Sequence, residues 1–388
     1  MRPRRPLPVA CCLIALCVSA FPCFPVSAFQ GVVIDHLVRP VDAQLIQSEL
    51  DAKGFFEVPL GRHLIDRPIV LRHDQTLSGK GLRSVLVYTG PGEWAVILGD
   101  ATKTIYRSGV ESLSITGGGL RGQRYGQHCW IRDVWISGAT GDGLRLDGVG
   151  DRFTVERVYS WQNGGAGFRI VAAYGTSNGL MLEKCNAQGN AGEGVVLETT
   201  SWGGQLVGTT LRDCTIQGNA LADVRSEILI KGWVAFTIID NCHVEGLRKL
   251  SLAPVGPASP PVIVEAGPPG PASVAPASPP VSHPVVGLRA VPAGPFASPT
   301  GVVNTRRPSD LLIDGGTTFH GYQRAMELVA MNGQTLLGHA WLVNNATIVW
   351  KSASDKVSDS THTKKPVLQV SASRGIKAEA IIADPLLE

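Results

Sequence analysis

The chain has 388 residues, of which 45 are glycine and 26 are proline, and only 17% are charged. Glycine lies well above its average share of about 7% without a collagen period, and charged residues fall below the usual ~25%. This composition argues against a helical bundle or coiled coil and indicates a turn-rich β protein. The supply of valine, leucine and isoleucine excludes a wholly disordered chain.

Residues 1–28 are predicted to be a secretory signal peptide. Three arginines precede an apolar run from Val9 to Val18, and Val26-Ser27-Ala28 is a small-residue cleavage site. The apolar run is too short for a membrane anchor, and no later stretch reaches about 18 apolar residues. We therefore expect a protein without a membrane span that is secreted, periplasmic or held at the cell surface.

Removal of this segment changes the charge of the chain. The formal net charge of the whole chain is +3, and residues 1–28 carry three arginines and no acid, which leaves 3 − 3 = 0. A neutral product has no broad electrostatic attraction for nucleic acid. Nucleic acid is therefore not an expected partner.

The first predicted element is a short amphipathic helix over residues 42–52. It is followed by short β-type segments in residues 54–87, which include the turn sequence Leu77-Ser-Gly-Lys-Gly81.

Internal repeats then dominate the sequence. Similar four-residue motifs begin at intervals of 24, 27, 29 and 28 residues, and a weaker copy begins at Val110. Their apolar residues alternate over three to six positions between Gly, Asn and Asp, which is typical of short strands and tight turns. This period predicts a β-solenoid in which each coil stacks on the preceding one. The motifs start at Ile131, Val155, Leu182, Leu211 and Ile239, with two later copies at Leu312 and Leu342.

Two columns of residues follow from this alignment. Asn163, Asn190 and Asn219 occupy one turn, where asparagine can take the left-handed conformation and bond to the next coil. Cys185, Cys214 and Cys242 fall in one inward column that continues Val134 and Val158. The spacing of stacked strands fits disulfide geometry poorly, so buried free thiols are expected.

The solenoid is interrupted by a segment rich in proline and alanine. Residues 252–300 contain fourteen of the 26 prolines and cannot form a hydrogen-bonded ladder, so a disordered insertion is predicted there. We expect one β-helix domain over residues 29–350 that contains this insertion, and a C-terminal tail over 351–388.

The segment 42–98 together with the coils resembles the pectate-lyase-like superfamily, especially its rhamnogalacturonase/epimerase-like branch. The resemblance covers about residues 42–350 and implies an all-β, right-handed parallel β-helix with a short N-terminal capping helix. Members of this superfamily include lyases, hydrolases, epimerases and proteins without known catalysis. The catalytic signatures of its polygalacturonases and pectate lyases are absent, so the resemblance assigns no catalytic residue.

The candidate site comes from the outward positions beside an inward column formed by Leu144, Phe168, Val195 and Val224. Alternation along a strand places an arginine stripe next to a carboxylate stripe on one sheet face, and aromatic residues on the loops that leave it. The candidate substrate-binding residues are Arg145, Arg169, Arg225, Tyr174, Trp202 and Trp233, and the candidate catalytic residues are Asp147, Glu198 and Glu227.

This chemistry suits a polysaccharide, because aromatic rings stack on sugars and arginines bind carboxylates. Glu198 and Glu227 are expected one coil apart, about 5 Å, and Asp147 and Glu198 two coils apart, about 10 Å. The first spacing would suit a retaining glycosidase and the second lies near the upper edge for an inverting one. In a lyase, Arg169 or Arg225 would neutralise the uronate.

Other interpretations remain open. The same stripes could be a solvated face with charge-matched neighbours, as could a second column formed by Arg132, Glu156, Glu183, Arg212 and Asp240. No cofactor and no metal ligand set is predicted, although calcium could bind where carboxylates of neighbouring coils converge. Two functions follow: a secreted lyase or hydrolase of uronate-containing glycans, or a non-catalytic surface or matrix protein that displays loops or binds glycans. The oligomeric state is left open.

Overall fold

The structure is a computed structural model of the chain, in which Pro40–Glu388 form one compact unit. It describes residues 41–99, 102–124, 126–148, 150–173, 175–219, 226–246, 286–297 and 303–320, and shorter segments between 322 and 383. The predicted signal peptide lies outside these residues. Within them, no helix is long and apolar enough to cross a bilayer.

The helix predicted at the N-terminal end of the solenoid is present as α1 (Ala43–Lys53). The side chain of Asp42 accepts a hydrogen bond from the backbone N–H of Leu45 and caps its first turn. Gly54 ends it with φ of 71°, where a Cβ would lie 3.0 Å from the carbonyl oxygen of Asp74. The inward face of α1, which includes Ile46 and Leu50, is buried against the first coil.

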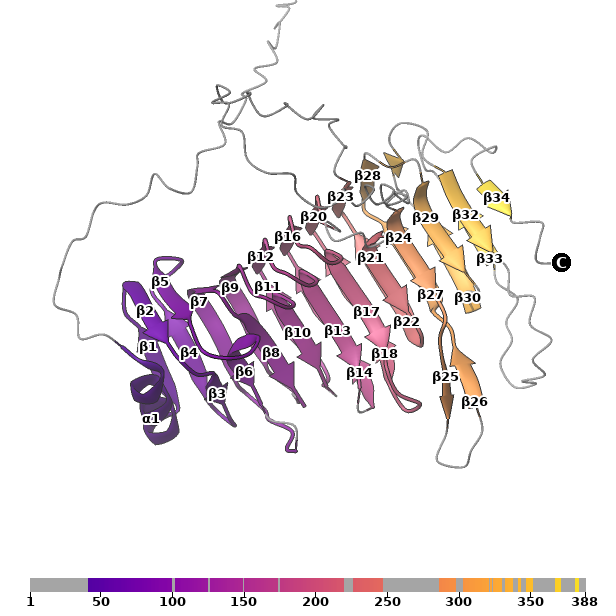
Figure 1. Ribbon diagram of the computed structural model, residues 1–388. Coiled ribbons are helices and arrows are strands. Elements are labelled where there is room, and N and C mark those ends of the chain that lie inside the picture. The colour runs from indigo at the N-terminus through magenta and orange to yellow at the C-terminus, as the bar shows by residue number, and fades with distance from the viewer. Residues whose placement is uncertain are drawn as a thin grey trace, which may run out of the picture. The chain divides into compact units, whose positions relative to one another are not determined.

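Two long parallel sheets follow (Figure 1). In the described residues, the larger one, sheet A, contains 21 strands, and the smaller one, sheet B, contains 11. The strands of sheet A are β1 (Phe55–Val58), β2 (Gly61–Ile65), β4 (Thr76–Gly79), β5 (Ser84–Tyr88), β7 (Gly109–Thr116), β9 (Trp130–Ser137), β11 (Thr154–Glu156), β12 (Tyr159–Trp161), β14 (Thr176–Asn178), β15 (Met181–Glu183), β16 (Asn186–Gln188), β18 (Gln205–Val207), β19 (Thr210–Arg212), β20 (Thr215–Gln217), β22 (Val234–Asp240), β23 (His243–Glu245), β27 (Ser309–Asp314), β28 (Thr318–His320), β30 (Asn332–Leu337), β31 (Trp341–Leu342) and β33 (Val367–Val370).

Sheet B takes one strand from each coil. Its strands are β3 (Ile69–Leu71), β6 (Trp94–Leu98), β8 (Gly119–Gln123), β10 (Leu144–Asp147), β13 (Phe168–Ala172), β17 (Val195–Thr199), β21 (Ser226–Lys231), β24 (Val286–Val291), β29 (Arg324–Val329), β32 (Thr347–Lys351) and β34 (Ile381–Ala383). A separate antiparallel pair is formed by β25 (Ala293–Ala297) and β26 (Val303–Arg306). The predicted fold, an all-β parallel β-helix with a short N-terminal helix, is confirmed.

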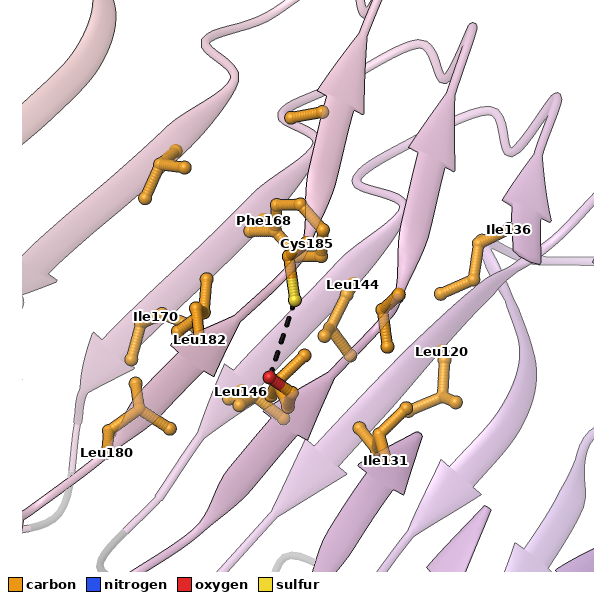
Figure 2. Packing of buried hydrophobic residues seen from close by; sticks show 14 of the residues in the cluster. Leu120, Ile131, Ile136, Leu144, Leu146, Phe168, Ile170, Leu180, Leu182 and Cys185 are labelled. Carbon is orange, nitrogen blue, oxygen red and sulfur yellow. Dashed lines mark hydrogen bonds between the residues drawn. The ribbon is translucent and has the colours of Figure 1, made fainter. Parts of the chain in front are cut away.

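The repeat alignment gives the register of the central coils. Val155 pairs with Ile131 and with Leu182, and Leu211 pairs with Leu182 and with Ile239, as the motifs predicted. The inward side chains of both sheets form one core, in which Leu144, Phe168 and Ile170 from sheet B face residues of sheet A (Figure 2). Burial of this continuous apolar column is what makes each coil stack on the next.

The cysteine column is also confirmed. Cys185, Cys214 and Cys242 are buried and unpaired, and each is at most 3% exposed. The Cys185 thiol donates a hydrogen bond of 3.4 Å to the carbonyl oxygen of Val155 in the preceding coil, drawn as the dashed line in Figure 2. Cys214 and Cys242 donate in the same way to Leu182 and Leu211, so each thiol has a partner inside the core.

The asparagine turn forms the predicted ladder, with one correction. The amide nitrogen of Asn163 donates to Asn190 over 2.9 Å, and that of Asn190 donates to Asn219 over 2.7 Å. The left-handed conformation lies one residue earlier, at Gln162, Gly189 and Gly218, because the asparagines turn inward and are buried. A second left-handed column, at Asp133, Arg157, Lys184, Asp213 and Asn241, marks the turn within sheet A.

The insertion is shorter than predicted. Residues 286–297 lie inside the predicted range 252–300, yet Val286–Val291 form β24, which pairs with β21 and β29. The apolar alternation of this strand was not recognised because the strand directly follows the proline-rich sequence. Residues 252–285 lie outside the described residues.

The later coils also differ from the prediction. Ile239 pairs with Ile313 rather than Leu312, and Ile313 pairs with Leu337, whereas Leu342 belongs to β31 and pairs with Phe319. The segment 351–388 was predicted to be a tail, but β33 and β34 extend sheets A and B within it.

Candidate functional site

The outer face of sheet B carries a row of arginines on successive coils. Arg121, Arg145 and Arg169 stand at paired positions of β8, β10 and β13, which lie side by side in Figure 1. The next two coils place Val196 and Leu229 at this position. The row therefore has three arginines in the three coils before β17.

Carboxylates join these arginines into one network. Asp147 lies 2.7 Å from Nη2 of Arg121 and 2.8 Å from Nε of Arg145. Asp142 accepts a bond of 2.8 Å from Nε of Arg169 and lies 3.9 Å from Nη1 of Arg145. Charge thus alternates along the coils without a break.

Arg169 continues the network to the next coil. Its Nη1 donates to Glu198 of β17 over 3.0 Å, so its guanidinium lies between Glu198 and Asp142. Burial alone would lower the pKa of Arg169, but the two carboxylates raise it above its usual range. Arg169 is therefore a permanent cation that two acids hold in place.

The acids and the arginines differ in exposure. The side chains of Asp147, Asp142 and Glu198 are only 2%, 10% and 12% exposed, whereas those of Arg121, Arg145 and Arg169 are 27%, 34% and 23% exposed. The carboxylates form the floor of the site, and the edges of the guanidinium groups reach solvent. At one end Arg121 lies over the ring of Trp94, 5.7 Å from its centre.

Asp142 and Arg121 belong to this network but were missed by the sequence analysis. Asp142 lies in the turn before β10 and accepts a bond of 2.7 Å from the backbone N–H of Ala166. A Cβ at Gly165 would lie 2.5 Å from its carboxylate, so glycine is needed there. Arg121 could have been found, because Leu120-Arg121 precedes Leu144-Arg145 by 24 residues, one coil of the repeat.

The predicted catalytic stripe holds only in part. Asp147 pairs with Val171 and Val171 with Glu198, so these two acids lie two coils apart as expected. Glu227 does not follow them: Lys231 pairs with Glu198, and Glu227 is fully buried. Glu198 and Glu227 lie in adjacent coils but not at paired positions, so the pairing behind their expected separation of about 5 Å is wrong.

The error arises in the sequence between Asn219 and β21. Ile228, and not Val224, pairs with Val195, because Ile228 follows its ladder asparagine by nine residues where Val195 follows by five. The predicted partner Arg225 lies outside the described residues, as does Tyr174.

Glu227 occupies the end of the asparagine ladder. Its carboxylate accepts bonds of 2.9 Å from the backbone N–H and 2.8 Å from the amide nitrogen of Asn219. Burial raises the pKa of Glu227 to about 7, although both hydrogen bonds act in the opposite direction. The contact of Glu227 with Asn219 is therefore structural. Because Glu227 is fully buried, it cannot reach a ligand on the outer face.

The predicted loop tryptophans lie where the chain passes from sheet B to sheet A. Trp202 is in the turn after β17, four residues beyond Glu198, and Trp233 is in the turn after β21. The backbone N–H of Trp233 donates to Thr199 Oγ1 over 3.0 Å, and its carbonyl accepts from Leu206. Both side chains are partly buried, and their two turns are adjacent.

The second charged column lies on sheet A and is more exposed. Arg212 and Asp240 form a pair of 3.0 Å with side chains 47% and 30% exposed, and Arg132 pairs with Glu111 over 2.7 Å. Such exposed pairs contribute little to stability. These contacts fit the structural interpretation of that column.

No group of three or more His, Cys, Asp or Glu that could hold a metal ion occurs among the residues that the structure describes. Asp147 and Glu198, at which calcium was considered, are each bound by arginine. Calcium stays an untested prediction.

Comparison with known proteins supports the fold. No protein-family model matches the chain, and no curated protein matches it. Among solved structures, the A-module of the mannuronan C-5 epimerase AlgE4 of Azotobacter vinelandii is similar, with a TM-score of 0.55 and 12% identity, covering 88% of this chain and 93% of that one.

Two further structures have the same architecture. DFA-IIIase of Arthrobacter chlorophenolicus A6 has a TM-score of 0.55 and 9% identity, covering 89% of this chain and 90% of that one. The catalytic unit of the GH87 α-1,3-glucanase of Streptomyces thermodiastaticus strain HF3-3 has a TM-score of 0.51 and 13% identity, covering 90% and 66%. The chain therefore has the parallel β-helix fold of these structures, which is the fold that the resemblance implied.

Proposed function

We propose that this chain is a secreted β-helix protein that binds an extended, uronate-containing polysaccharide along the outer face of sheet B. The observation that carries the proposal is the row Arg121, Arg145 and Arg169, whose guanidinium edges reach solvent above a floor of buried carboxylates. Successive coils repeat every 4.7–4.9 Å or so, and an extended polymer that lies along the solenoid would meet one arginine per coil.

The network prepares these arginines for binding. Each arginine donates a hydrogen bond from its Nε–H to a carboxylate, and this bond fixes the plane of the guanidinium before a ligand binds. Little side-chain entropy is then lost on binding. The exposed N–H groups can donate to uronate carboxylates and sugar hydroxyls, and Trp94 supplies ring surface beside Arg121. Trp202 lies in the turn after β17, four residues beyond Glu198.

The same contacts favour binding over catalysis. A general acid or base must exchange its proton with the substrate, and Asp142, Asp147 and Glu198 are each engaged by at least one arginine. The similar enzymes named above act on saccharides according to their names, which supports a saccharide ligand for this fold. Lyase or hydrolase action is the second candidate, for which Asp147 and Glu198 are the residues to test.

A panel of neutral and uronate-containing polysaccharides tests both candidates. Binding is read by co-sedimentation with insoluble glycans and by calorimetry with soluble ones, while ultraviolet absorbance of unsaturated uronate and release of reducing ends report cleavage. Binding of a uronate polymer without either product supports the proposal. Formation of either product supports the enzyme, and absence of binding across the panel rejects a glycan site on this face.

A further inference from the structure

A second surface lies on the outer side of sheet A, in the half formed by β7, β9, β12, β16 and β20 (Figure 1). The register places two outward positions of each strand in columns across these five coils. The outward residues of this strip, called the neutral strip below, are Ser114, Thr116, Trp135, Ser137, Tyr159, Trp161, Asn186, Gln188, Thr215 and Gln217.

Three aromatic rings cluster near the middle of the neutral strip. The ring centres of Trp135 and Tyr159 are 4.4 Å apart with a tilt of 34°, and Trp161 meets Trp135 edge-on at 6.0 Å. All three side chains are partly buried and partly exposed. They come from two adjacent coils and form one contiguous aromatic cluster, called the platform below.

Packing alone does not require aromatics here. The core lies on the other side of the sheet, where Ile136 and Ser160 point inward from the same strands. Outward positions of the two neighbouring coils are small or polar, as at Thr116 of β7 and Asn186 of β16. The platform is thus a partly exposed aromatic patch within a polar surface, which indicates a binding site.

The surroundings of the platform specify the chemistry of its ligand. None of the ten outward residues of the neutral strip is charged, whereas sheet B presents arginines and acids. Next to the rings stand amides that offer both donors and acceptors. Tyr159 Oη donates to Gln188 Oε1, which holds both groups in place. The side-chain oxygen of Asn186 is buried and has no hydrogen-bond partner among the described residues.

We infer that the neutral strip binds a neutral glycan, whose sugar faces stack on Trp135, Tyr159 and Trp161 while its hydroxyls bond to the flanking amides. Stacking on aromatic faces needs no charge. Amides and hydroxyls can donate hydrogen bonds to the hydroxyls of a sugar and accept hydrogen bonds from them, and they carry no positive charge that would attract uronate. This site is separate from the arginine row and takes a different substrate class. It does not depend on the proposed function of sheet B.

Binding of hexasaccharides tests the inference. Full-length secreted protein is titrated with β-1,4-, β-1,3- and α-1,3-linked glucose hexamers and with a hexauronate, with calorimetry and tryptophan fluorescence as readouts. At least one neutral hexamer should bind and quench fluorescence. Trp161→Ala should weaken that binding at least tenfold, while hexauronate binding stays unchanged.

Two matched variants control the experiment. Trp130 is an outward tryptophan of the same strand as Trp135 but lies in the other half of sheet A, where it bonds to Glu111. Trp130→Ala should leave neutral glycan binding within twofold, and Arg169→Ala should affect the hexauronate alone. Circular dichroism melts confirm that each variant is folded.

Three results would overturn the inference. The first is that no neutral hexamer binds. The second is equal loss from Trp161→Ala and Trp130→Ala. The third is that gel filtration shows a dimer that Trp161→Ala dissociates, since the platform would then be an interface between two copies of the chain.

Discussion

Glu227 accepts two hydrogen bonds from Asn219, one from its backbone N–H at 2.9 Å and one from its side-chain amide at 2.8 Å. In the preceding coils, Asn190 bonds to the same two groups of Asn163, and Asn219 to those of Asn190. A carboxylate therefore takes the place of the next asparagine and closes the ladder. It does so in the last coil before residues 252–285.

The burial of Glu227 predicts a pH dependence of stability. Its pKa is raised from an ordinary 4.5 to about 7 by burial, so between these values the folded protein keeps a proton that the unfolded chain releases. The stability from this group is fully present below about pH 4.5 and is lost as the pH rises through about 7.

Urea unfolding of the native protein and of Glu227→Gln at pH 4.5, 6 and 8 measures this effect. The free energy of unfolding of the native protein should fall relative to that of the variant as the pH rises across this window. The contributions of the other titrating groups are the same in both proteins and cancel in the difference between their free energies of unfolding. A difference that is constant with pH would contradict the assignment.

The middle of the ladder should be among the most sensitive positions of the fold. Asn190 is fully buried, accepts from Asn163 and donates to Asn219 and to the carbonyl oxygen of Ser160. Asn190→Ala leaves several of these groups unpaired, and we expect a loss of about 2–4 kcal/mol in the free energy of unfolding.

Asn178→Ala is the matched control for this loss. Asn178 is an exposed amide that bonds to Asp151 over 3.0 Å, and its removal should cost less than about 1 kcal/mol. Chemical denaturation of both variants gives the comparison. Similar losses would show that the ladder has no special role in stability.

The boundary of the insertion predicts different outcomes for two deletions. Replacing residues 252–285 with a short Gly/Ser bridge removes no described strand, and because each doubling of loop length costs only about 0.6 kcal/mol, the melting temperature should stay within a few degrees. Deletion of 252–300 also removes β24, which pairs with β21 and β29, and should prevent cooperative folding of the later coils. Thermal melts followed by circular dichroism distinguish the two deletions. A collapse in the shorter deletion would show that the segment packs on the solenoid.

The sequence predicts the fold well where the coil length is regular. Motifs from Ile131 to Ile239 pair as aligned, because both turns of sheet A keep a fixed length and a left-handed residue in each coil. The alignment fails at β21, since four extra residues follow Asn219 and the apolar Val224 satisfies the same pattern as the true partner Ile228.

The site was harder to predict than the fold. Arg145, Arg169, Asp147 and Glu198 follow from strand alternation and the coil period, and the structure brings them into one network. Asp142 does not, because it lies in a turn and reaches the outer face only where Gly165 leaves room for its carboxylate. Ion pairs between coils depend on the conformation of such turns, which the period of the sequence does not predict.

Arg169 should contribute to the stability of the protein as well as to binding. The guanidinium of Arg169 lies between Asp142 and Glu198, both nearly buried. Its removal takes the arginine from Glu198 and leaves Asp142 with only Arg145, at 3.9 Å, as a cationic neighbour, so we expect a loss of roughly 1–3 kcal/mol. Arg212→Ala, in an exposed pair, should cost less than about 1 kcal/mol. Equal losses in urea unfolding would show that the network does not stabilise the face.

Recognition of uronate by the arginine row is tested by calorimetric titration of a uronate hexasaccharide into the native protein and into Arg145→Ala. Arg145 keeps the most exposed guanidinium of the row, and Asp147 retains Arg121 when it is removed. We expect saturable binding that weakens by about 1–3 kcal/mol in the variant, because a charge-assisted hydrogen bond is lost. Arg212→Ala should bind as the native protein does. Undiminished binding by Arg145→Ala, or equal weakening in both variants, would contradict recognition by the arginine row of sheet B.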